Sequence, residues 1–268
     1  QDTVSYDGLP VANADDTYTM TGTLMDKETG ESVKDASGNP ITASTNFHNT
    51  TESGTVILEF RVSDAAAVLE GKTVVVFEVI TDKDGKEIAK HEDIEDEDQT
   101  VHFPGVKTTA TDDAGSKELF ASGKMTVVDD VEVTNVTPGN EYTIKGTLID
   151  KATGETAVDA TGKPITSSVT FVPTTANGSI KLTFTFDGSN FEGKTLVAFE
   201  KLYDMDNCLV GNHENPDDKE QTVTVPKIRT TFVGENGLHV VKGGADTLTL
   251  VDTVSYENLV PGKTYTLN

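Results

Sequence analysis

Residues 180–186, Ile-Lys-Leu-Thr-Phe-Thr-Phe, decide the fold, because apolar and polar side chains alternate one by one along them. Successive side chains of a β-strand point to opposite faces of its sheet, so this alternation predicts a half-buried strand. Residues 142–148 place three large apolar side chains on one face with similar spacing. Turn sequences with Gly and Pro, such as residues 37–40 and 161–164, separate the runs. The sequence therefore predicts an all-β protein of antiparallel strands.

The chain repeats itself at an interval of about 122 residues. Gly-Thr-Leu-Met-Asp-Lys at residues 22–27 returns as Gly-Thr-Leu-Ile-Asp-Lys at residues 146–151. The apolar strand that ends at Glu78 returns as the strand that ends at Glu200. An interval of this size fits one domain with its own hydrophobic core. Several short strands per interval are typical of an immunoglobulin-like β-sandwich, so we expect tandem domains of that class.

The repetition predicts three segments, which we call the first, second and third repeat. They are residues 1–103, residues 104–225 and residues 226–268. We expect the second repeat to be whole, the first to lack the strand that opens the second, and the third to hold only its opening strands. Residues 252–256, Asp-Thr-Val-Ser-Tyr, restate residues 2–6 and show how the third repeat resumes the pattern of the first.

Charge and composition exclude several classes of function. The chain has 45 acidic and 21 basic residues, which gives a formal net charge of −24. A surface this acidic repels nucleic-acid phosphates and anionic lipid headgroups, so we expect neither as a partner. No apolar run approaches the roughly 18 residues of a membrane-spanning helix, so we expect no membrane insertion. The single cysteine, Cys208, excludes an intrachain disulfide.

No arrangement of residues indicates a cofactor or a metal ion. His48, His102 and His239 have no partners at the spacing of a metal site. The acidic turns at residues 82–85 and 204–206 resemble calcium loops only in part, because they lack the full series of ligands. We therefore expect no cofactor and no metal.

The end of each of the first two repeats carries a set of polar residues at constant offsets. The set is a Glu that closes an apolar strand, followed by a His, an Asp and a Gln. It consists of Glu78, His91, Asp96 and Gln99 in the first repeat and of Glu200, His213, Asp218 and Gln221 in the second. The intervening residues differ while the offsets are kept, which indicates a geometric requirement. Each Glu shares one face of its strand with apolar residues, and a partly buried carboxyl must be paired or protonated.

These motifs resemble those of a known family, the VaFE or T-Q ester-bond domains of Gram-positive surface adhesins and pilus-like stalks. The resemblance rests on Val-Ala-Phe-Glu at residues 197–200 and on the pattern His-x4-Asp-x2-Gln-Thr at residues 91–100 and 213–222. The first repeat has Val-Val-Phe-Glu at residues 75–78, which departs from the family signature at one residue. In such immunoglobulin-like domains a Thr of the first strand is joined to a Gln of the last by a self-formed intramolecular ester.

The resemblance implies an ester between Thr108 and Gln221 in the second repeat. It favours Thr108 over its neighbour Thr109, and only one of the two can face Gln221, because adjacent strand residues point to opposite sides. The groups that assist the reaction would be His213, Asp218 and Glu200. In the first repeat the resemblance assigns Gln99, His91, Asp96 and Glu78 but no nucleophile, and in the third it assigns Thr230 but no Gln.

The residue types fit the chemistry that such a bond needs. A carboxamide is a poor electrophile and a hydroxyl a weak nucleophile, so the reaction requires a base, an acid and fixed proximity. His213 is the natural base and proton shuttle. We expect a proton shared between Asp218 and Glu200 to polarise the Gln221 carbonyl. Each domain would react once, so we expect no enzyme with turnover.

The leading hypothesis is a structural stalk segment of a bacterial cell-surface adhesin, extracellular and attached to the cell wall through parts outside this chain. Its partners would be neighbouring domains of the same array, and a link between Thr230 and Gln99 would join molecules head to tail. One alternative is a binding module that recognises a host glycan or protein without a covalent cross-link. Another is a hydrolase that uses His213 and Asp218 on an exogenous substrate.

Overall fold

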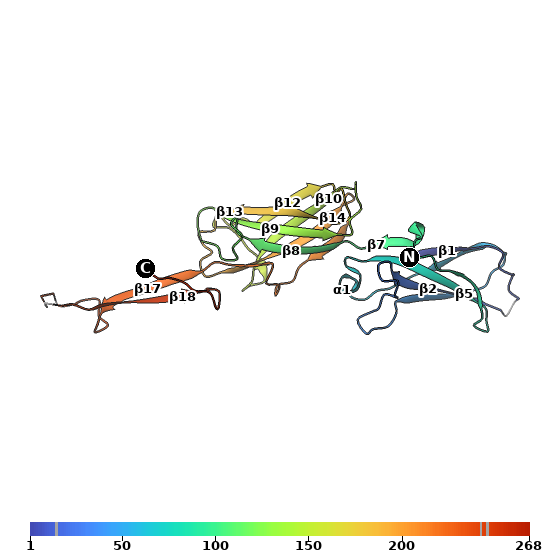
Figure 1. Cartoon of the computed structure of the whole chain (residues 1–268), viewed down its shortest axis with the longest axis horizontal. Coiled ribbons are helices and arrows are strands. Elements are labelled where there is room, and N and C mark those ends of the chain that lie inside the picture. Colours follow the sequence, from blue (N-terminus) through green and yellow to red (C-terminus); the bar gives the residue numbers. More distant parts are fainter. Residues whose placement is uncertain (14–15, 242, 245–246) are drawn as a thin grey trace. The chain divides into compact units, whose positions relative to one another are not determined.

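The computed structural model describes residues 1–13, 16–241, 243–244 and 247–268, and β-strands dominate it (Figure 1). Within these residues the helical structure is the short helix α1 (Ala65–Leu69) and the one-turn 3₁₀ helix Glu97–Gln99. None of the described helices is long and apolar enough to cross a membrane. The prediction of an all-β fold is confirmed.

The chain packs as two compact units. The first unit comprises Gln1–Val106, Val133–Asn140 and Val172–Gly178. The second unit comprises Lys107–Glu132, Glu141–Phe171 and Ser179–Asn268. The second unit therefore holds most of the second repeat and all of the third.

The strands of the first repeat form two antiparallel sheets. The strands are β1 (Asp2–Tyr6), β2 (Tyr18–Asp26), β3 (Thr42–Phe47), β4 (Gly54–Leu58), β5 (Thr73–Thr81), β6 (Glu87–His91) and β7 (Thr100–His102). One sheet is the pair β1–β4, and the other has the order β3-β2-β5-β6 with β7 also paired with β5. Met20, Leu58 and Ile80 are buried in one cluster of the core that these sheets enclose.

The second unit contains two larger facing sheets and a separate two-stranded one. Its strands are β8 (Gly105–Thr111), β9 (Met125–Thr134), β10 (Tyr142–Asp150), β11 (Glu155–Thr156), β12 (Thr166–Phe171), β13 (Gly178–Phe186), β14 (Thr195–Asp204), β15 (Leu209–His213), β16 (Thr222–Thr224), β17 (Lys227–Gly234) and β18 (Leu250–Glu257). One sheet has the order β13-β9-β8, and the other has the order β11-β10-β14-β15, with β12 on β10 and β16 on β14. The strands β17 and β18 pair with each other.

The alternating run at residues 180–186 lies in β13, as the sequence predicts. Leu182, Phe184 and Phe186 are buried, while the side chains between them are exposed. Figure 1 shows β13, β9 and β8 as one layer and β10 and β14 as the layer that faces it. Ile144 and Leu148 of β10 are fully buried, so the apolar faces of the two layers form the core between them.

The same cross-strand register recurs in both repeats and fixes where the buried glutamates lie. Gly146 of β10 is opposite Glu200 of β14, and Glu200 is in turn opposite His213 of β15. In the first repeat, Gly22 is opposite Glu78, and Glu78 is opposite His91. Because directly opposite residues point to the same face of a sheet, each row places the histidine beside the glutamate.

Gly146 is a glycine because the facing layer leaves no room for a side chain. A Cβ atom at this position would lie 2.2 Å from Cδ2 of Leu182 and 2.7 Å from Cζ of Phe184. These atoms belong to fully buried side chains of the opposite sheet, which cannot move into solvent. The missing side chain thus lets β13 pack directly over the row that carries Glu200.

We predict that Gly146→Ala lowers the free energy of unfolding by about 1–3 kcal/mol, because overpacking displaces core side chains. Gly123→Ala is the matched control, since a Cβ at Gly123 meets no atom within 4 Å. The control should stay within about 0.5 kcal/mol of the parent chain. Urea unfolding of both variants measures the difference, and equal stabilities would contradict this account of the packing.

Candidate functional site

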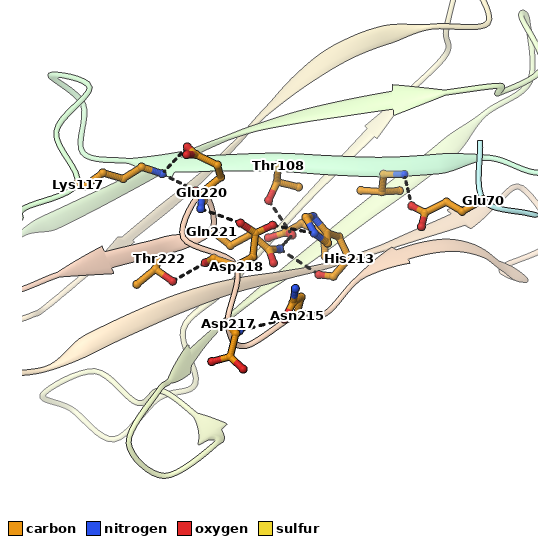
Figure 2. A network of polar contacts seen from close by, with 12 residues as sticks. Glu70, Thr108, Lys117, His213, Asn215, Asp217, Asp218, Glu220, Gln221 and Thr222 are labelled. Carbon is orange, nitrogen blue, oxygen red and sulfur yellow. Dashed lines mark hydrogen bonds and ion pairs between the residues drawn. The ribbon is translucent and has the colours of Figure 1, made fainter. Parts of the chain in front are cut away.

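A cluster of buried polar side chains lies between the two sheets of the second unit (Figure 2). Thr108 comes from β8, Glu200 from β14, and Gln221 from the residue just before β16. Glu200 and Gln221 are completely buried, and Thr108 is almost so. Polar groups buried so deeply normally have hydrogen-bond partners, because removal from water costs free energy that the fold must offset.

Glu200 holds Thr108 and Gln221 at a single oxygen atom. The Thr108 hydroxyl donates a hydrogen bond to Oε2 of Glu200 at 3.2 Å, and the Gln221 Nε2 donates to the same Oε2 at 2.7 Å. Nε2 of Gln221 also donates to the backbone oxygen of His213 at 3.2 Å. The Gln221 Oε1 is buried and has no hydrogen-bond partner among the described residues. The hydroxyl and the carboxamide are thus gathered around one carboxyl group.

The strand alternation of β8 selects Thr108 as the inward residue. Val106, Thr108 and Ala110 are buried on one face of the strand, whereas Thr109 is exposed on the other. Of the two adjacent threonines, the first therefore faces the interior, where its hydroxyl contacts Glu200.

Backbone hydrogen bonds fix the position of Gln221. The Ala198 nitrogen donates to the Gln221 oxygen at 3.0 Å, and the Ala110 nitrogen donates to the Glu220 oxygen at 2.8 Å. The turn before Gln221 is closed by Asp218, whose Oδ1 accepts from the Glu220 nitrogen at 2.8 Å. The carboxamide therefore projects from a segment that is attached to both sheets.

His213 lies at the end of β15 and contacts Asp218 through one ring nitrogen. Nε2 of His213 is 3.1 Å from Oδ2 of Asp218 (Figure 2). Nδ1 of the same ring is buried and has no hydrogen-bond partner among the described residues. When Nε2 donates its proton to the carboxylate, Nδ1 of the neutral ring carries the free lone pair and is the basic atom.

The carboxyl group that pairs with Glu200 is that of Asp129, on β9. Burial, followed by the charge and hydrogen bonding of Asp129, raises the pKa of Glu200 to about 10. Burial also raises the pKa of Asp129. Two carboxyl groups in contact in a dry interior cannot both ionise, so the pair retains a proton at neutral pH.

The expected pairing of Asp218 with Glu200 is wrong, and Asp129 was not anticipated. Asp218 contacts His213 instead, and Asp129 takes the place beside Glu200. A signal for Asp129 was present in the sequence. The segment that opens with Asp2 in the first repeat and Asp252 in the third aligns with Asp129, and Asp129 interrupts an otherwise apolar inward face of β9.

The first repeat holds a more exposed arrangement of the same residue types. Burial and the charge of Asp2 raise the pKa of Glu78 to about 8. His91 lies 3.5 Å from Oε2 of Glu78 through Nδ1 and 3.2 Å from Oδ2 of Asp96 through Nε2. Its side chain is 48% exposed, against 20% for His213. Gln99 ends the 3₁₀ turn and is half-buried.

Thr230 and Cys208 lie on the surface of the second unit. Thr230 is exposed on β17, where it pairs with Val254 of β18. Cys208 is a free, exposed thiol. Across the part of the chain that the structure describes, no group of three or more His, Cys, Asp or Glu side chains could hold a metal ion.

The solved structures that resemble this chain do so at low sequence identity. A bacterial adhesin from Mobiluncus mulieris, described as containing intramolecular disulfide, isopeptide and ester bond cross-links, is 15% identical over 57% of this chain and 76% of its own, with a TM-score of 0.38. A second crystal form of that adhesin gives a TM-score of 0.37, at 15% identity over 57% of this chain and 75% of its own. A putative β-galactosidase from Bacteroides fragilis is 10% identical over 85% of this chain and 32% of its own, with a TM-score of 0.33. No curated protein matches the chain.

The family assignment comes from the sequence as a whole. The model of the T-Q ester bond containing domain matches residues 1–103, 104–225 and 226–268. These three matches account for the whole length of the chain. The chain therefore belongs to the T-Q ester bond domain family and is built of tandem copies of that domain.

Proposed function

We propose that the second repeat forms an ester between Oγ1 of Thr108 and Cδ of Gln221, and that the chain is a structural segment of a bacterial surface adhesin. The observation that carries the proposal is that both side chains bind the same buried oxygen of Glu200. Family membership supports it, since the family is defined by such a bond. The cluster acts on the chain that contains it and reacts once, so the protein is not a turnover enzyme.

The acid pair activates the carboxamide. A half-turn about the Cγ–Cδ bond of Gln221 exchanges the positions of Nε2 and Oε1. Oε1 then accepts a hydrogen bond from the proton that Glu200 and Asp129 retain. This hydrogen bond stabilises the negative charge that develops on Oε1 when the hydroxyl attacks. Burial of the pair keeps the proton available at neutral pH, because the pKa of Glu200 is raised to about 10.

His213 moves the proton. Nδ1 takes the proton of the Thr108 hydroxyl as Oγ1 bonds to Cδ of Gln221, and the positive charge on the ring is stabilised by Asp218 at 3.1 Å. The proton then passes to the amide nitrogen, the C–N bond breaks, and ammonia leaves. The balance is one hydroxyl and one primary amide converted into one ester and one ammonia. The dry surroundings protect the ester from hydrolysis.

The position of the bond suits a protein that carries tension. Thr108 lies near the start of the second repeat and Gln221 near its end. A force applied along the chain then passes through the ester, whereas in an unlinked domain it must be resisted by hydrogen bonds that contribute about 1 kcal/mol each. A stalk on a bacterial surface needs this resistance, and this chain cannot obtain it from disulfides, since Cys208 is its single cysteine.

We predict that the purified chain has a mass lower than its sequence mass by one ammonia for each ester formed. Thr108→Ala should abolish the mass deficit of one ammonia that the second repeat contributes. Thr109→Ala should keep this deficit, because Thr109 faces solvent. Intact-mass spectrometry before and after treatment with hydroxylamine, which cleaves esters, measures both. A full mass for the parent chain would refute the bond, and a deficit that resists hydroxylamine would indicate an isopeptide instead.

We predict that the ester stabilises the second repeat by about 4–5 kcal/mol, from the entropy of closing a loop of roughly 110 residues in the unfolded chain. Thr108→Ala should lose this stabilisation, and Thr109→Ala should retain it. Unfolding in guanidinium chloride, followed for both variants and the parent, gives the difference. Equal midpoints for Thr108→Ala and the parent would contradict the role of the bond in stability.

We predict that the Thr108→Ala variant loses stability as the pH rises from 5 to 9. The ordinary pKa of a Glu is 4.5 and that of Glu200 in the fold is about 10, so in this range the folded chain binds a proton that the unfolded chain releases. The free energy of unfolding therefore declines with pH, by at most about 1.4 kcal/mol per pH unit. Adding Glu200→Gln should flatten the decline. Urea unfolding of both variants at several pH values tests this. If the free energy of unfolding declines equally with pH in both variants, Glu200 is not the group that binds the proton.

A further inference from the structure

We infer that Lys117 is a positioning residue for the ester: its side chain and its backbone hold the segment that carries Gln221 close to β8 and to Thr108. Lys117 belongs to the connection between β8 and β9, in the second unit. The inference rests on the proposed function. It adds to that function a residue outside the cluster of acids and histidine described above.

A turn after β8 brings the chain back at Lys117. Asp112 closes this turn, since its Oδ1 accepts a hydrogen bond from the Ser116 nitrogen at 2.6 Å. The Asp112 nitrogen also donates to the Ser116 oxygen at 2.8 Å. Gly115 has a φ of 83°, which glycine adopts without strain. The turn therefore fixes the position of Lys117 relative to the end of β8.

The side chain of Lys117 binds the residue that precedes Gln221 (Figure 2). Nζ of Lys117 donates a hydrogen bond to the backbone oxygen of Glu220 and lies 3.4 Å from Oε2 of the same residue. The Ala110 nitrogen of β8 donates to that same backbone oxygen at 2.8 Å. Glu220 is thus attached to Lys117 and to β8 at one atom, and Ala110 is two residues from Thr108.

The backbone of Lys117 binds the segment again beyond Gln221. The Thr224 nitrogen donates to the Lys117 oxygen at 2.8 Å, and the Leu119 nitrogen donates to the Thr224 oxygen at 2.8 Å. Gln221 therefore lies between two attachments to Lys117, one at Glu220 and one at Thr224. These two attachments limit how far the carboxamide can move away from the Thr108 hydroxyl.

The segment before Gln221 has little burial to hold it in place. Of residues 214–220, all except Asp218 are exposed. The attachment to Lys117 therefore supplies a restraint that packing does not. Because a displacement of about 1 Å can slow a reaction between fixed groups about 100-fold, loss of this restraint should slow formation of the ester.

The charge of Lys117 also favours the distribution of protons that the proposed chemistry needs. Burial raises the pKa of Asp129, whereas neighbouring groups, the positive charge of Lys117 among them, act to lower it. Lys117 thus favours ionisation of Asp129 and retention of the proton by Glu200. Glu200 is the carboxyl group that contacts both reacting side chains.

The test measures how fast the ester forms while the chain folds. Each chain is dissolved in urea from inclusion bodies, a sample taken before dilution checks that it has its full mass, and dilution starts refolding. Samples stopped with acid at intervals give, by intact-mass spectrometry, the fraction that has lost one ammonia.

Lys117→Met keeps the length of the side chain but removes its charge and its hydrogen-bond donors. We expect this variant to form the ester at least about ten-fold more slowly than the parent chain. Lys117→Arg should return the rate to near that of the parent, because a guanidinium group can donate to the same two oxygens of Glu220.

Lys181→Met is the matched control. Nζ of Lys181 on β13 is 3.2 Å from Oδ2 of Asp130 on β9, and both side chains are exposed. This variant therefore removes a surface ion pair from the same unit and should form the ester at the rate of the parent.

The same substitutions in a Thr108→Ala chain, which has no hydroxyl to form the ester, separate positioning from folding. In that chain Lys117→Met and Lys181→Met should refold at the same rate and unfold at the same urea concentration, as followed by circular dichroism. A clearly lower midpoint for Lys117→Met would show that Lys117 supports the fold as a whole and would overturn the positioning role.

The outcomes distinguish this inference from the proposed function. If the parent forms the ester and Lys117→Met forms it equally fast, the inference fails and the proposed function stands. The same holds if Lys117→Arg does not restore the rate. If the parent keeps its full mass after refolding, the proposed function fails and the inference fails with it.

Discussion

The second unit depends on the burial of a carboxyl group that keeps its proton. Glu200 is enclosed between two sheets, beside Asp129, and its pKa is raised to about 10. An ionised Glu200 in this place would destabilise the fold, whereas a protonated one can hold a hydroxyl and an amide together. The cost of taking the acid out of water is thus linked to the proposed chemistry, because the same dry environment that raises the pKa of Glu200 would also exclude water from the ester.

The two glutamate sites show how packing sets this chemistry. In the second unit, β8 covers Glu200, and His213 is largely buried. In the first repeat, Glu78 has the same neighbours in the register, but His91 is about half exposed and the pKa of Glu78 is raised only to about 8. Since the residue types are the same in both, the difference arises from how much of each site the surrounding strands cover.

Much of this could be predicted from the sequence. Alternation along residues 180–186 predicted the strands, and the repeated offsets identified Glu200, His213, Asp218 and Gln221 before any contact was known. The pairing of the carboxyl groups could not be predicted in the same way, because it depends on how one sheet lies over the other. Asp129 comes from the β13-β9-β8 sheet and Glu200 from the facing one. An offset along the chain does not show which residues of two layers meet.

The attachment of Gln221 to both sheets also affects how the domain responds to proteases. With the proposed ester in place, residues 108–221 form a closed ring of covalent bonds. A single cut in any loop within that ring opens it but leaves the two ends of the domain connected through the side chains. Backbone bonds to Ala110 and Ala198 would hold the nicked segments in place. Proteases must then cleave twice to sever such a segment.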